Sequence, residues 1–104
     1  MGHSGAALQV WDDRAVPREA VHLRTRGTGP GGRTLAMLLV NISVDGFMAR
    51  VDRILPADRL SVHLPGIGLV EAEVRWALGG RAGCRFVRPL APDAYRNLLE
   101  QHRT

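Results

Sequence analysis

Hydrophobic and polar residues alternate with a period of two over most of the chain, which is typical of strands that bury one face. This alternation, interrupted by turns rich in Gly and Pro, predicts about six short strands, at residues 18–26, 34–43, 47–51, 60–64, 69–78 and 82–87. The side chains expected to point inward are Val21, Leu23, Thr25, Leu60, Val62, Leu64, Val70, Ala72, Val74, Trp76, Cys84 and Phe86. Residues 34–43 are apolar on both faces, so this strand is expected to be buried on both sides. Short antiparallel strands at this spacing favour a closed barrel or a sandwich.

The end of the chain changes to a helical period. Residues 91–103 place Pro92 near a helix start, Asp93 in the first turn and Arg103 at the end, where the helix dipole favours a cation. The apolar positions at helical spacing are Tyr95, Leu98 and Leu99. We expect this one helix to cover an open end or edge of the β structure.

The length and composition restrict the class of protein. A chain of 104 residues, 45% of them hydrophobic, is long enough for one core. We expect a flexible segment at residues 1–11 and a single domain at residues 12–104. No apolar run approaches the roughly 20 residues that span a bilayer, and no signal peptide is recognisable. The single cysteine, Cys84, excludes an internal disulfide and favours a reducing, cytoplasmic location.

The charge favours an anionic partner. The formal net charge is +4, and all fourteen basic residues are Arg. Each guanidinium is a planar fork that binds a phosphate or a guanine edge through two hydrogen bonds and stacks on a base.

Several sequence patterns resemble functional motifs but do not predict a site. A GxGxxG run at residues 27–32 lies between two expected strands, whereas a dinucleotide site needs it between a strand and a helix. The four histidines and Cys84 lack metal-ligand spacing, so no metal site is predicted. His22 and His63 are expected to be solvated, and Cys84 to be a buried thiol without a base. No set of residues suits acid–base or nucleophilic catalysis, so we predict neither an enzyme nor a cofactor. Trp76 could be a stacking platform, but its position in the inward row predicts a core residue.

Two short motifs do suggest a site. Arg14 and Arg18 form RxxxR just before the first expected strand, and Pro17 favours an extended approach to it. Asn41, Ser43 and Gly46 form NxSxxG, with the Ser in a place that an ordinary hairpin turn does not need.

This pair of motifs, at this separation, resembles the PilZ domain. Residues 17–26 resemble the first strand of that family, and residues 74–86 resemble its late hairpin, with a Trp and a closing Gly-x-x-Phe. The likeness covers roughly residues 12–100. It implies a six-stranded antiparallel β-barrel of the PilZ split-barrel type with a C-terminal α-helix, and it implies binding of the bacterial second messenger cyclic di-GMP.

The resemblance assigns the ligand to Arg14, Arg18, Asn41, Ser43 and Gly46. The arginines would bind guanine or phosphate, the amide would bind a guanine edge, and the hydroxyl would reach phosphate or base. Gly46 would permit the turn conformation and a close backbone approach. The residues before the first strand would form a mobile arm that becomes ordered over the ligand and creates a surface for a downstream protein partner.

Two alternatives remain at this point. The chain could be a PilZ-like module that binds no nucleotide and acts as a protein-interaction domain. It could also be a small barrel that binds RNA or DNA, as its pI of about 10.9 suggests. Only five residues are aromatic, and such surfaces need aromatic side chains for base stacking, so a nucleic-acid partner is not expected.

Overall fold

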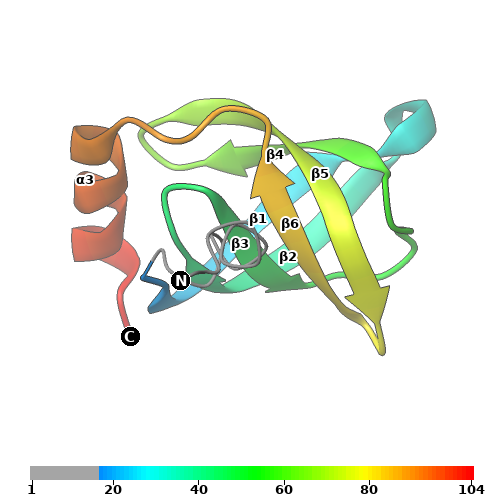
Figure 1. The fold of residues 1–104 in the computed structure, drawn as a ribbon, viewed down its shortest axis with the longest axis horizontal. Coiled ribbons are helices and arrows are strands. Elements are labelled where there is room, and N and C mark those ends of the chain that lie inside the picture. The colour runs from blue at the N-terminus through cyan, green and yellow to red at the C-terminus, as the bar shows by residue number, and fades with distance from the viewer. Residues whose placement is uncertain (1–16) are drawn as a thin grey trace, which may run out of the picture.

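The structure, a computed structural model, describes residues 17–104, in which six strands form a closed antiparallel barrel with one helix at its end (Figure 1). The strands are β1 (Glu19–Thr28), β2 (Thr34–Ile42), β3 (Gly46–Arg50), β4 (Arg59–Leu64), β5 (Gly68–Leu78) and β6 (Arg81–Phe86). A short 3₁₀ turn, η1 (Pro30–Gly32), joins β1 to β2, and the helix is α3 (Pro92–His102). The predicted fold class, strand number and C-terminal helix are confirmed.

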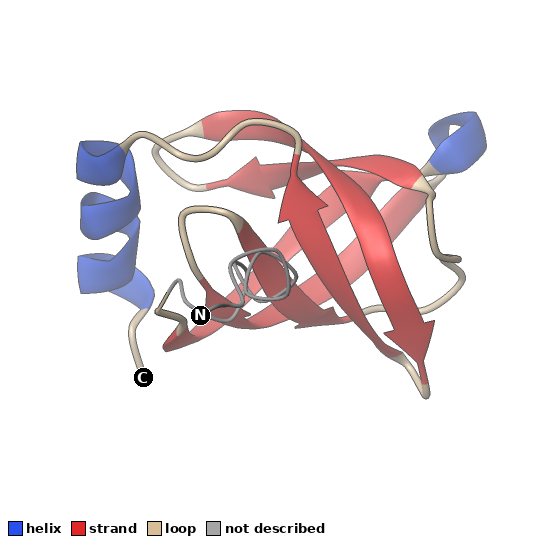
Figure 2. Ribbon diagram, in the orientation of Figure 1, coloured by secondary structure: helices blue, strands red, loops and turns tan. Residues whose placement is uncertain are grey.

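The strands follow the order β1-β2-β3-β6-β5-β4 around the barrel, and β4 closes it by pairing with the far end of β1 (Figure 2). Every pair is antiparallel. This closure involves only two residue pairs, Gly27 with Val62 and Thr28 with Ser61, and nearer the start of β1 an isolated bridge joins Val21 to Arg103 at the end of α3. The order also brings β3 beside β6, although residues 51–80 lie between them in the sequence, and these two strands carry the site described below.

The barrel interior is filled by aliphatic side chains and two phenylalanines. Phe47 of β3 and Phe86 of β6 pack with their ring centroids 5.4 Å apart. Leu39, Ile42 and Val62 are fully buried around them. The alternation predicted for β1, β4 and β6 is confirmed, since Val21, Leu23, Leu60, Val62, Leu64, Cys84 and Phe86 are all buried.

The prediction that residues 34–43 are buried on both sides is wrong for the first half of β2. Thr34 and Ala36 are exposed, Leu35 and Met37 are buried, and the outward side chains become half-buried only from Leu38 onward. A barrel wall has solvent on its outer face, so apolar residues on that face stay exposed unless another element covers them.

The placement of Trp76 in the core is also wrong. Its side chain is 42% exposed. The pairing of β5 with β6 shifts register between Val74 and Trp76, which marks a β-bulge at Arg75. The extra residue reverses the alternation, so Val74 points inward while Arg75 and Trp76 both lie on the outer face.

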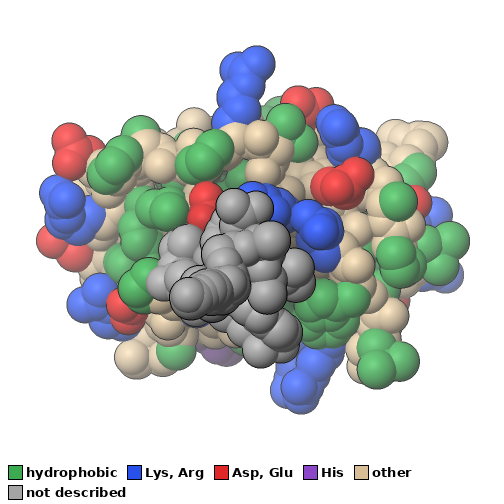
Figure 3. Space-filling model, in the orientation of Figure 1, with side chains coloured by type: hydrophobic (Ala, Val, Ile, Leu, Met, Phe, Trp, Pro, Cys, Tyr) green, Lys and Arg blue, Asp and Glu red, His purple; other side chains and the backbone are tan. Residues whose placement is uncertain are grey.

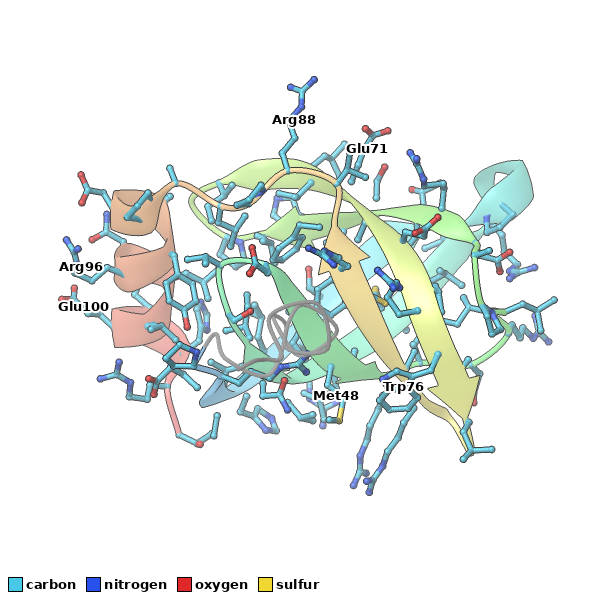
Figure 4. The ribbon with its side chains drawn as sticks, viewed as in Figure 1. Met48, Glu71, Trp76, Arg88, Arg96 and Glu100 are labelled. Atoms are coloured by element: carbon cyan, nitrogen blue, oxygen red, sulfur yellow. The ribbon has the colours of Figure 1, made fainter. Side chains whose placement is uncertain are left out.

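Helix α3 covers one end of the barrel, at the left of Figure 1. It buries Leu98 and Leu99, while Arg96 and Glu100 point away from the barrel (Figure 4). The hydroxyl of Tyr95 donates a hydrogen bond of 3.0 Å to the carbonyl oxygen of Ile42, at the end of β2. Within residues 17–104, no helix is long and apolar enough to cross a membrane.

Candidate functional site

The link between β2 and β3 is a tight turn held by its own hydrogen bonds. The backbone N–H of Ser43 donates to the carbonyl of Gly46 at 2.8 Å. The hydroxyl oxygen of Ser43 accepts the backbone N–H of Asp45 at 3.1 Å, as in the turns that Ser and Thr form with the residue two positions later. The Ser that sequence analysis attributed to a ligand therefore also stabilises the turn.

Neighbouring segments fix the outside of this turn. The N–H of Phe86 donates to the carbonyl of Asp45, and the N–H of Leu90 donates to the carbonyl of Val44, each at 2.8–2.9 Å. The hydroxyl of Tyr95 on α3 also bonds to Ile42, so β6, the loop that contains Leu90, and α3 together hold the turn in place. The turn is thus a preformed part of the barrel wall.

Gly46 is required by packing between strands. A Cβ atom at this position would lie 2.2 Å from the carbonyl oxygen of Cys84 and 3.1 Å from the Cα of Arg85. Gly46 is absent from the glycines with positive φ, so the expectation that it supplies a special turn conformation is wrong. The expected close backbone approach is present, and the strand approached is β6.

Arg18 and Asn41, the other motif residues within the described part of the chain, lie together. The Nη1 of Arg18 donates to the Oδ1 of Asn41 at 3.5 Å, the long limit for a hydrogen bond. The Nδ2 of Asn41 lies 4.0 Å from the sulfur of Met48. Arg18 is exposed just before β1, so its guanidinium can turn toward a ligand at small cost. Arg14 lies outside the described residues.

The turn forms one wall of a shallow hollow on the outer face of β3, β6 and β5. Its lining consists of Arg18, Ser43, Asp45, Gly46, Arg75, Trp76, Gly83, Cys84 and Arg85. Three of these side chains are cationic and one, Asp45, is anionic, so the hollow has an excess of positive charge. In Figure 3, arginine and hydrophobic side chains lie next to one another over the region of β5 and β6. A ligand with both anionic and planar apolar parts suits this combination.

The lining residues that were not assigned to the site from the sequence include three with large side chains: Arg75, Trp76 and Arg85. Arg75 and Trp76 reach the outer face together because of the bulge. Arg85 lies opposite Gly46 on β6. These residues come together only because β6 pairs with both β3 and β5. No local sequence pattern in these strands indicates that pairing.

The thiol of Cys84 is buried beneath the hollow, as predicted. Burial raises the pKa of Cys84 from 9.0 to about 12, so the thiol stays protonated and unreactive near neutral pH.

His22 and His63 are exposed, which confirms their predicted solvation. Within residues 17–104, no three His, Cys, Asp or Glu side chains are grouped in a way that could hold a metal ion.

This raised pKa predicts a loss of stability at high pH. The unfolded thiol ionises near its ordinary pKa, so the stabilising contribution of burial is complete below that value and is lost as the pH rises toward about 12. Between pH 8 and pH 10.5, the urea midpoint should fall further in the natural protein than in a Cys84→Val variant. Equal losses in both proteins would show that the thiol is not the cause. A thiol reagent at pH 8 should label Cys84 only after urea is added.

Comparison with known proteins agrees with this architecture. A family model described as the PilZ domain matches residues 12–102, which is most of the chain. No curated protein matches the chain at a significant level.

Proposed function

Because the chain belongs to the PilZ domain family, a family of non-enzymatic binding domains that includes cyclic di-GMP receptors and adaptors, we propose that it binds cyclic di-GMP at the hollow beside the β2–β3 turn. The observation that supports this most is the joint position of the two motifs. Arg18 lines the same hollow as Ser43 and Gly46, although more than 20 residues separate them.

The chemistry of the motif residues suits this ligand. Cyclic di-GMP carries two phosphates and two guanines, and an Arg fork pairs with a phosphate or with the O6 and N7 atoms of guanine. Arg14 and Arg18 take this role in the proposal. Asn41 offers an amide to a guanine edge. Ser43 uses one oxygen lone pair within the turn, so its O–H remains free to donate to the ligand.

The same proposal extends to how ligand binding is passed on to a protein partner. In this proposal the arm that carries Arg14 and Arg18 becomes ordered over the bound ligand, and the combined face of arm and turn contacts a protein partner in the bacterial cytoplasm. The ligand shifts the arm toward this closed state to the extent that it binds that state more tightly. No cofactor takes part.

Calorimetric titration tests the proposal. Cyclic di-GMP should bind, while GTP, the linear dinucleotide pGpG and single-stranded DNA should bind much more weakly or not at all. Absence of cyclic di-GMP binding to the folded protein would favour the alternative of a module that only contacts proteins. Comparable binding of DNA would favour a nucleic-acid function.

Ser43→Ala should affect both the turn and the ligand. The partly buried N–H of Asp45 loses its acceptor, so the free energy of unfolding should fall by about 1 kcal/mol, and affinity for cyclic di-GMP should also fall. Ser61→Ala on β4, across the barrel, provides the matched control and should leave the affinity unchanged. If Ser43→Ala lowers stability but binds as the natural protein does, Ser43 serves the turn alone.

A further inference from the structure

We propose that a second surface of the barrel wall, a band of arginine and leucine side chains outside the ligand hollow, docks an acidic segment of a partner protein. This inference goes beyond the proposed function and does not depend on it. It follows from the register of five strands, from the exposure of the side chains that the register brings together, and from their charge.

Strand register places the members of this band side by side. Arg24 on β1 is the partner of Leu38 on β2, and Leu38 is the partner of Arg50 on β3. Arg50 is in turn the partner of Arg81 on β6, and Arg81 is the partner of Leu78 on β5. Neighbouring strands lie about 4.8 Å apart, so these five residues form a continuous row about 19 Å long. We call it the arginine row.

The side chains of the arginine row lie on the outer face of the wall. The three arginines are exposed, Leu78 is 81% exposed, and Leu38 is half-buried. Within residues 17–104, the side chains of Arg24, Arg50 and Arg81 make no ion pair and no hydrogen bond. No carboxylate of the described chain therefore neutralises these three cations.

The pairing of Arg50 with Arg81 favours an anionic partner. Like charges directly opposite each other on antiparallel strands repel. A carboxylate between the two guanidinium groups removes this repulsion, and each group can bind it through two hydrogen bonds. The turn of Gly79 and Gly80 has no side chains, so the hollow that it lines together with both arginines stays open to a partner. Asp52 is the acidic residue of this lining, and the two arginines outweigh its charge.

The composition of the row favours a protein segment over a nucleic acid. Surfaces that bind single strands stack bases on aromatic side chains, and the arginine row contains none. Leu78 and Leu38 instead offer contacts to apolar side chains placed between acidic ones. Arg26, which pairs with Ala36 in a neighbouring row, adds another exposed cation beside Arg24.

The arginine row borders the ligand hollow. Met48, Gly83 and Trp76 form the next row, two residues away along β3, β6 and β5, and Gly83 and Trp76 line the hollow. Figure 4 shows Met48 and Trp76 near each other along this edge of the barrel. A segment docked on the arginine row therefore lies about 7 Å from the edge of the hollow.

The test uses a fluorescein-labelled peptide in which glutamates are interspersed with leucines, and a second peptide with glutamine in place of each glutamate. Anisotropy should show saturable binding of the acidic peptide to the natural protein, weakened by added salt, and no binding of the glutamine peptide. The double variant Arg50→Gln, Arg81→Gln should weaken binding by about 2- to 30-fold, as expected for two exposed ion pairs. Because the two charges repel, this variant should unfold at or above the temperature of the natural protein.

A charge-matched variant separates the row from the net charge. The double variant Arg59→Gln, Arg88→Gln removes two exposed cations elsewhere on the barrel and should leave peptide binding nearly unchanged. Equal losses in the two double variants would mean that only net charge matters, and would overturn the inference. Natural peptide affinity in the folded Arg50→Gln, Arg81→Gln protein would also overturn it. Tighter binding of single-stranded DNA than of the peptide, lost in the same variant, would assign the row to a nucleic acid instead.

Cyclic di-GMP binding distinguishes this inference from the proposed function. Neither Arg50 nor Arg81 lines the ligand hollow, so their double variant should bind cyclic di-GMP as the natural protein does. A large loss of that affinity would make the row part of the ligand site and contradict the inference. If the natural protein binds the acidic peptide but no cyclic di-GMP, the proposed function fails and the arginine row stands.

Discussion

Arg18→Ala should weaken binding of cyclic di-GMP by about 1–3 kcal/mol, or about 5- to 150-fold, because it removes a charge-assisted pair with the ligand. Arg18 is exposed, and its hydrogen bond to Asn41 is long, so the thermal unfolding temperature should change little. Arg14→Ala should have an effect of similar size if both arginines of the motif hold the ligand. Calorimetry and thermal unfolding on the same samples measure the two effects.

Two further variants are the controls: Arg24→Ala for the loss of charge and Arg18→Lys for the geometry of the side chain. Arg24→Ala removes an exposed cation from β1, outside the hollow, and should leave the affinity nearly unchanged. Arg18→Lys keeps the charge but loses the planar fork, so it should recover only part of the affinity. Natural affinity in folded Arg14→Ala and Arg18→Ala proteins would contradict the assignment of the motif to the ligand.

Phe47→Ala should have the largest effect on stability, lowering the free energy of unfolding by about 3–5 kcal/mol. Phe47 is fully buried and packs against Phe86, so the shorter side chain leaves a cavity at the centre of the barrel. For a domain with a typical stability of about 5–15 kcal/mol, this is a large fraction of the total. Urea denaturation measures the loss directly.

Leu69→Ala is the matched control for the core. Leu69 is 72% exposed on β5, so its removal should change stability by less than about 0.5 kcal/mol. A loss below 1 kcal/mol in Phe47→Ala would mean that the barrel interior adapts around the missing ring, and that the packing described here does not determine stability.

The local patterns of the sequence predicted the strands and helix well. Alternation in β1, β4 and β6 depends only on which face meets the core, so it could be read from the sequence. The helical period of α3 and the position of Pro92 at its start are likewise local. The exposed residues of β2 were missed because apolar side chains on an outer wall look the same in sequence as buried ones.

The site was harder to predict because its geometry is set by strand pairing. The need for Gly at position 46 comes from the carbonyl of Cys84, which is distant in sequence. The exposure of Trp76 comes from a bulge defined only by the pairing with β6. The Ser43 turn, in contrast, is local, and the Ser-x-Asp spacing could have indicated it.

We propose that cyclic di-GMP binds on the outer face of β3, β6 and β5 beside the β2–β3 turn. Mapping of backbone amide chemical shifts during a titration tests it most directly. The largest changes should fall at residues 18–20, 41–48, 74–76 and 83–85. The η1 turn and the outward face of α3, which lie at opposite ends of the barrel, should change little. Changes centred on α3 or η1, or spread evenly over the chain, would contradict the claim.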